Sequence, residues 1–206
     1  AEYLALLLIA TAGMMLLASV QELIALYVAL ELATLPLVAL AAFLGDSRSS
    51  EAGLKMLLLS ALSSGLILYG MALIYGFLGT TELVAIGNEI VRGNDPFGGP
   101  VLLLATVLVV AGLGFKIATV PFQMWIPDVY EGSPTSVTTF FALIPKIAAI
   151  SVFIRFMYVP FINVIAQWQT IIIFLSIASM ILGAVAAIGQ TNIKRLMAYS
   201  SIGHMG

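Results

Sequence analysis

The sequence has no cysteine, one histidine and very little charge. Only 9% of its 206 residues are charged, whereas 62% are hydrophobic, and the net charge is −2. The absence of cysteine excludes disulfides, thiolate nucleophiles and cysteine-ligated metal clusters, and a single histidine argues against a dedicated metal site. A soluble fold of this size could not cover its surface with so few charges, and without a basic patch the chain is not expected to bind nucleic acid. A polytopic helical membrane protein remains.

Charge is missing from long uninterrupted runs, and these runs locate the membrane spans. Four charge-free runs contain 19, 26, 20 and 38 residues and cover 3–21, 56–81, 96–115 and 156–193. A bilayer core about 30 Å thick needs about 20 helical residues. The strands of membrane barrels alternate over only about 10 residues, so these runs exclude a barrel. The sequence therefore predicts an all-α, polytopic bundle of transmembrane helices.

We expect six full or nearly full helices and the start of a seventh. Their ranges are about 2–20, 22–44, 51–79, 101–130, 134–159 and 162–189, and the seventh begins near 192. The longest polar connection contains an amphipathic segment at 82–92, which we expect at the membrane interface. The chain lacks an initiator Met and a basic signal region, so we interpret it as an interior piece of a longer protein.

Three charged residues lie in mid-span, each about two or more helical turns from the nearest flanking charge: Glu31, Lys116 and Lys146. A charge near the bilayer centre costs at least about 2.5–3.5 kcal/mol on insertion scales, so each needs a reason to be there. Buried acids and amines can exchange protons near neutral pH, which makes these residues candidates for an ion or proton path. The alternative is structural: a lysine can extend to the interface, or an ion pair can dock two helices.

A helix break is expected directly after Lys116. Pro121 removes a backbone donor and clashes with the carbonyl four residues earlier, so the helix at 101–130 should be discontinuous near 117–122. Broken helices inside membranes free backbone groups that bind ions or water. A plain proline kink used for packing is the alternative.

Other polar residues have ordinary explanations on position alone. Lys55 follows Glu51 by four residues, the favourable order for an ion pair on a helix surface. Asp128 and Glu131 are most simply placed in a solvated loop. His204 is either a relay group or a hydrogen-bonded core residue, and its position favours neither.

Two segments resemble the antiporter-like membrane subunits of respiratory complex I (NADH:quinone oxidoreductase). Residues 121–134 read PFQMWIPDVYEGSP, and residues 192–206 read NIKRLMAYSSIGHMG. The sequence of the first segment is most like that of subunit N of that family, and the resemblance covers nearly the whole chain. It implies a first five-helix repeat at 1–159, corresponding to family helices 4–8. The start of a second, inverted repeat follows at 160–206, with family helix 9 and the beginning of helix 10.

The same resemblance implies roles for the charged residues. Glu31 and Lys116 would form a mid-membrane ion pair whose rearrangement loads or releases a proton, Lys146 would pass the proton on, and Lys55 would take part in proton uptake. Quinone reduction elsewhere in the complex would drive the movement, and this chain would carry no cofactor of its own. Its partners would be other membrane subunits of complex I and the lipid bilayer of the bacterial plasma membrane, with quinone and NADH bound only by partner subunits.

Three alternatives remain open beside this interpretation. The chain could be a subunit of a multisubunit cation/proton antiporter, which would work without an electron-transfer partner. It could belong to a membrane-bound hydrogenase-type complex, whose pumping subunits are similar. It could also be a structural spacer whose buried charges only fix helix packing.

Overall fold

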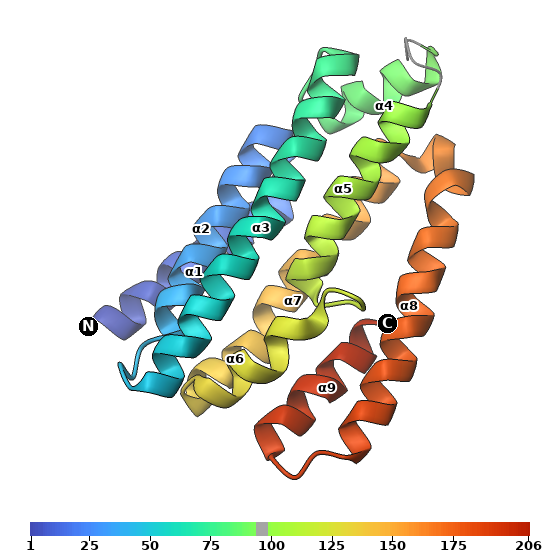
Figure 1. Ribbon diagram of the computed structural model, residues 1–206. Helices are drawn as coiled ribbons and strands as arrows, with labels where there is room; N and C mark the ends of the chain where they lie inside the picture. The colour runs from blue at the N-terminus through green and yellow to red at the C-terminus, as the bar shows by residue number, and fades with distance from the viewer. Residues whose placement is uncertain (94–98) are drawn as a thin grey trace.

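A computed structural model describes residues 1–93 and 99–206, and these residues form a bundle of helices (Figure 1). The longer helices are α1 (Glu2–Ser19), α2 (Leu23–Ala41), α3 (Ser47–Leu78), α5 (Pro100–Ile117), α7 (Thr135–Tyr158), α8 (Ile165–Ile188) and α9 (Ile193–Met205). The shorter elements are α4 (Leu83–Val91), α6 (Ile126–Gly132), and the 3-10 turns η1 (Gln123–Trp125) and η2 (Ile162–Val164). The predicted all-α fold is confirmed for the described part of the chain.

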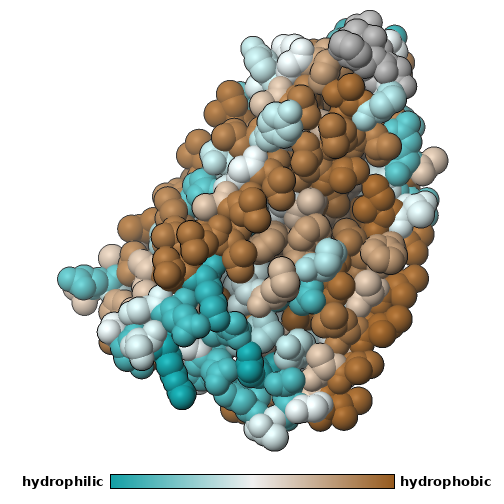
Figure 2. Space-filling model, in the orientation of Figure 1, coloured by the Kyte–Doolittle hydropathy of each residue, from teal (hydrophilic) through white to brown (hydrophobic). Residues whose placement is uncertain are grey.

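Six segments among the described residues are long and apolar enough to cross a membrane: α1, α2, α3, α5, α7 and the segment Ile162–Ile188. Large apolar side chains are exposed along these helices, and Figure 2 shows hydrophobic side chains over most of the visible face. Such a surface suits lipid and would be unstable in water. The chain is therefore an integral membrane protein.

Two helix ends differ from the sequence-based ranges for local reasons. We expected a helix at 51–79, but α3 begins at Ser47, because the carboxylate of Asp46 accepts a hydrogen bond of 2.8 Å from the backbone N–H of Ser49 and caps the helix. The helix expected at 22–44 ends at Ala41, followed by a turn to Gly45.

The interfacial segment is tied to the bundle at its start. The backbone N–H of Leu23 donates to the carbonyl of Thr81 at 2.9 Å, and that of Leu83 donates to the carbonyl of Gln21 at 2.9 Å. These two bonds join the start of α2 to the start of α4 as a single antiparallel bridge. The expected amphipathic segment at 82–92 is thus the helix α4, held at one end of the bundle (Figure 1).

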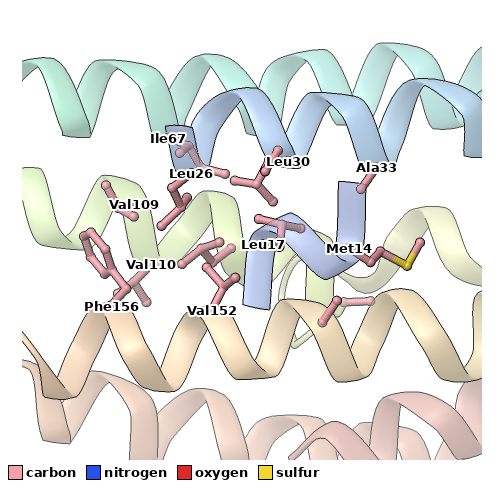
Figure 3. Close-up of a cluster of buried hydrophobic side chains, with 14 of the residues drawn as sticks. Met14, Leu17, Leu26, Leu30, Ala33, Ile67, Val109, Val110, Val152 and Phe156 are labelled. Atoms are coloured by element: carbon pink, nitrogen blue, oxygen red, sulfur yellow. The ribbon is translucent and has the colours of Figure 1, made fainter. Parts of the chain in front are cut away.

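Close backbone contact joins α3 to α5 in the bundle core. A Cβ added at Gly112 would lie 2.8 Å from the carbonyl oxygen of Ser63, and one at Gly70 would lie 2.7 Å from that of Ala105. Ser63 also donates a hydrogen bond of 2.8 Å to the Gly112 carbonyl. Small residues and a buried hydroxyl let these helices approach closely, as is typical of membrane bundles. Around this contact, apolar side chains from α1, α2, α3, α5 and α7 fill the core (Figure 3).

The expected break after Lys116 is present, and it lies inside the bundle. Helix α5 ends at Ile117, Ala118 has a left-handed φ of 65°, the Val120–Pro121 peptide bond is cis, and α6 resumes after η1. The single long helix α3 packs against both α5 and α6, so the break falls beside the middle of a continuous span (Figure 1). A discontinuous helix is therefore part of this fold, in agreement with the prediction for 117–122.

Candidate functional site

Lys116 occupies the last turn of α5, where the chain leaves the helix. Helix C-termini carry unpaired carbonyls and partial negative charge, which favour a cation there. The Lys116 ammonium is half-buried and donates a hydrogen bond of 3.1 Å to the hydroxyl oxygen of Thr34 on α2. Thr34 lies one turn after Glu31 on the same face of α2.

A small cavity adjoins this ammonium. It has a volume of about 50 Å³, and its polar lining comes from Lys116, Thr34 and Ser60, with Trp125 at one side. A cavity of this size holds at least one water, which needs two to four polar partners. Pro145, the residue before Lys146, also lines it, so the cavity reaches from the break in α5 to α7.

Glu31 is held by a different helix. Its carboxylate accepts a hydrogen bond from the hydroxyl of Ser64 on α3. Lys116 and Glu31 act on each other through space, but among the described residues no ion pair within 4.0 Å joins them. The direct Glu31–Lys116 ion pair implied by the resemblance is therefore not formed in this structure, and each charge has a hydroxyl partner.

Lys146 lies on α7 and is only 2% exposed. Its ammonium donates to the hydroxyl of Ser201 on α9, and it stands 5.8 Å from the centre of the Tyr130 ring on α6. A cation at this distance from an aromatic face is stabilised electrostatically. Lys146 is thus placed where the beginning of the expected second repeat meets the broken helix.

Lys55 lies away from the interior charges, in a cluster at the end of the bundle where α3 begins and α6 and α9 lie. Its ammonium is 2.7 Å from a carboxylate oxygen of Asp128 and 2.8 Å from one of Glu51. The other Asp128 oxygen is 2.6 Å from the Arg195 guanidinium, which also lies 3.2 Å from Glu131. Figure 2 shows hydrophilic side chains gathered at this end. We call these five residues the end cluster.

The end cluster corrects one expectation. We placed Asp128 and Glu131 in a solvated loop, but both lie on α6 and pair with charges from α3 and α9. Gly132 allows the approach of α6 to α3, because a Cβ there would lie 2.8 Å from the Arg48 carbonyl. The hydrogen bond from Lys55 lowers the pKa of Asp128 below its ordinary value.

His204 lies in the last turn of α9 and is partly exposed beside a groove between α8 and α9. Its Nδ1 atom is 2.8 Å from the Ser200 carbonyl of its own helix. This contact is local to α9, and the groove beside His204 is not lined by Glu31, Lys116 or Lys146.

The structure does not bring the four candidate residues into one centre. Lys116 shares its surroundings with Glu31, whereas Lys146 and Lys55 have separate partners. The partners that sequence reasoning missed are the hydroxyl residues and one arginine: Thr34, Ser64, Ser201 and Arg195. Only Thr34 had a local signal, since it follows Glu31 by three residues.

Residues 20–206 match the family described as NADH:quinone oxidoreductase/Mrp antiporter, transmembrane. NADH-quinone oxidoreductase subunit N of Pelagibacter ubique (strain HTCC1062) is 57% identical over 206 residues, which are all of this chain and 43% of that protein. Subunit N 1 of Rhizobium meliloti (strain 1021) is 56% identical over 206 residues, with 100% of this chain and 42% of that protein covered. The chain therefore spans less than half the length of these relatives.

Solved structures agree with the sequence relatives. Respiratory complex I from Thermus thermophilus with bound aureothin contains a chain 41% identical, with a TM-score of 0.82 over 99% of this chain and 43% of that one. The Mrp complex from Dietzia sp. DQ12-45-1b contains a chain that is 24% identical, with a TM-score of 0.87 over 97% of this chain and 37% of that one, which shows the shared fold alone. The chain belongs to the membrane family of NADH:quinone oxidoreductase and Mrp antiporter subunits, and its relatives confirm the resemblance to subunit N.

Proposed function

We propose that this chain is the part of a complex I subunit N that carries a proton path, with residues 1–159 as the first repeat and 160–206 as the start of the second. In this proposal Glu31, Lys116 and Lys146 bind and release protons, and Lys55 takes part in proton uptake. Quinone reduction in partner subunits supplies the driving force, and the other membrane subunits of complex I are the partners. The names of the relatives, at up to 57% identity, support this assignment.

One observation carries the proposal: Lys116 lies in the last turn of α5 at the break, with its ammonium on Thr34, one turn from Glu31. A lysine placed this way has two possible partners on one helix face, a neutral hydroxyl and a carboxylate. Changing the partner changes the free energy of the protonated form, because a carboxylate favours the ammonium more strongly than a hydroxyl does. A change of partner could therefore load or release a proton at Lys116.

The test is Lys116→Ala in the full-length subunit within its purified complex, reconstituted in vesicles. We expect assembly to be kept and most proton pumping to be lost, measured as protons moved per NADH oxidised. Lys116→Arg is the matched variant, because arginine keeps the charge but does not release its proton near neutral pH. A relay requires both variants to lose pumping, whereas a structural spacer requires the arginine variant to keep it.

Two results would contradict the proposal. Unchanged pumping in Lys116→Ala at normal subunit levels would remove Lys116 from the path. Sodium-dependent transport without NADH:quinone activity in the co-purified complex would instead place the chain in a cation/proton antiporter.

A further inference from the structure

Each of the three interior charges is met by a hydroxyl from another helix. Ser64 on α3 donates to the Glu31 carboxylate. Lys116 on α5 donates to Thr34 on α2, and Lys146 on α7 donates to Ser201 on α9. Helix contacts in membranes often use such hydroxyls, and each of these three bonds ends on an ionisable group.

The hydroxyl hydrogens of the two lysine partners are already used. Thr34 donates its hydrogen to the Leu30 carbonyl at 2.7 Å, and Ser201 donates its hydrogen to the Ala198 carbonyl at 2.8 Å. A hydroxyl has one hydrogen and two lone pairs, so each of these oxygens faces its lysine only as an acceptor. The hydrogen bond within its own helix therefore fixes each hydroxyl as an acceptor, which is the role that a donating ammonium requires.

We propose that Thr34 is a positioning residue that holds the Lys116 ammonium apart from Glu31; this inference rests on the proton path proposed above. Thr34 and Glu31 share one face of α2, so the ammonium can lie on either. Ser64 donates to one oxygen of the Glu31 carboxylate, while the fixed acceptor of Thr34 gives the ammonium a neutral partner. Lys116 thereby rests outside a direct ion pair, in which its proton is bound more tightly, and can release the proton when it lies on Thr34.

Ser201 accepts from Lys146 in the same way, but this bond joins the two expected repeats. Its helix, α9, belongs to the expected second repeat, whereas α7 belongs to the first. Ser201 therefore positions the Lys146 ammonium toward the second repeat, whereas the neighbouring residue Pro145 lines the cavity beside Lys116.

The test uses Thr34→Val in the full-length subunit, within the assembled complex in vesicles. Valine keeps the branched shape but cannot accept a hydrogen bond. Thr34→Ser restores the acceptor and serves as the rescue variant. Thr106→Val is the matched control, because Thr106 is buried on α5 and donates to the carbonyl four residues earlier at 2.8 Å, as Thr34 does, but has no charged partner among the described residues.

We expect Thr34→Val to shift the Lys116 ammonium from position 34 toward Glu31 by about tenfold or more, the scale of losing a hydrogen bond to a charged group, and thereby to lower the protons moved per NADH oxidised. Thr34→Ser and Thr106→Val should pump at the wild-type ratio. In a structure of the Thr34→Val complex, the Lys116 ammonium should lie on the Glu31 carboxylate. For Lys146, the corresponding test variant is Ser201→Ala. Its control is Ser151→Ala, which removes a hydroxyl that bonds only within α7.

The role of Thr34 and the proton path can be disproved separately. If Thr34→Val pumps at the wild-type ratio while Lys116→Ala does not, the role of Thr34 is overturned and the proton path stands. If Lys116→Ala pumps normally, the proton path itself is wrong. Thr34→Ala provides a second variant without an acceptor, and wild-type pumping by it also overturns the inference if Thr34→Val does not assemble.

Discussion

The interior charges and the end cluster use the same residue types in opposite ways. Lys146 is 2% exposed and meets a neutral hydroxyl, whereas the Lys55 side chain is 40% exposed and meets two carboxylates. Opposite charges at the end are paired at 2.6–3.2 Å, but Glu31 and Lys116 in the interior are kept on separate partners. Water screens the exposed pairs, so each pair contributes at most about 1 kcal/mol, and only several together fasten the helices.

A direct ion pair in the interior would behave differently. In a low-dielectric setting the attraction is strong, and separating the two charges leaves each unpaired at a cost of several kcal/mol. Hydroxyl partners satisfy a buried ammonium without fixing it in this way. The comparison therefore suggests that the end cluster holds helices together, while the interior contacts leave the charges free to change partners.

The largest effect should appear when a buried interior lysine is replaced and compared with a less buried lysine near the end cluster. Lys146→Ala should remove most proton pumping, because its ammonium is buried and lies between α7 and α9. Lys194 is the matched control: it donates to the Ser133 carbonyl at 2.7 Å near the end cluster, and Lys194→Ala should leave the pumping ratio unchanged. Vesicle pumping and NADH oxidation measured together decide this. Equal losses in the two variants would show that burial does not separate the lysines by function.

The second prediction concerns stability at the end cluster. Asp128→Asn removes one partner from both Lys55 and Arg195, so α6 loses charged contacts with α3 and α9. The groups are about one-third exposed, which limits the expected loss to about 1–2 kcal/mol. Thermal unfolding of the complex in detergent should begin a few degrees lower, with the pumping ratio kept near wild type. Loss of pumping without loss of stability would instead place Asp128 in the proton path.

Much of the fold could be predicted because its signals are local. Charge-free runs located the spans, and Pro121 predicted the break beside Lys116, since a missing donor and a ring clash act within one turn. Glu31 and the lysines stood out because charge is so rare in this chain. Local sequence signals are thus enough to find the charged residues that are costly to bury.

The partners of those groups could not be predicted in the same way. Asp128 meets Lys55 and Arg195 across 73 and 67 residues of sequence, and only the return of α6 between α3 and α9 creates these contacts. Ser64 and Ser201 carry no distinguishing pattern, because serine is common where membrane helices approach closely. Tertiary packing therefore decided which of many hydroxyls meets a charge.

The third prediction concerns how the stability contributed by Asp128 in the end cluster changes at low pH. The bond from Lys55 lowers the pKa of Asp128, on α6 and outside the six spans, so its ionised form is favoured by folding. This contribution is fully present above the ordinary carboxyl pKa of about 4 and is lost as the pH falls through the lower folded value. Wild-type complex should therefore lose stability relative to Asp128→Asn below about pH 4. If the stabilities of the two proteins fell equally from neutral to acid pH, the ion-pair assignment would be contradicted.

The smallest expected effect comes from the outermost member of the end cluster. The Glu51 side chain is 64% exposed, and its bond to Lys55 spans one turn of α3. Such surface pairs contribute about 0.3–0.5 kcal/mol, and salt screens them. Glu51→Gln should therefore shift thermal unfolding by about one degree or less at low salt and not measurably at high salt, because Asp128 still holds Lys55. A shift as large as that of Asp128→Asn would mean that Lys55 depends on the pair within its own helix, and that the contact with α6 contributes little.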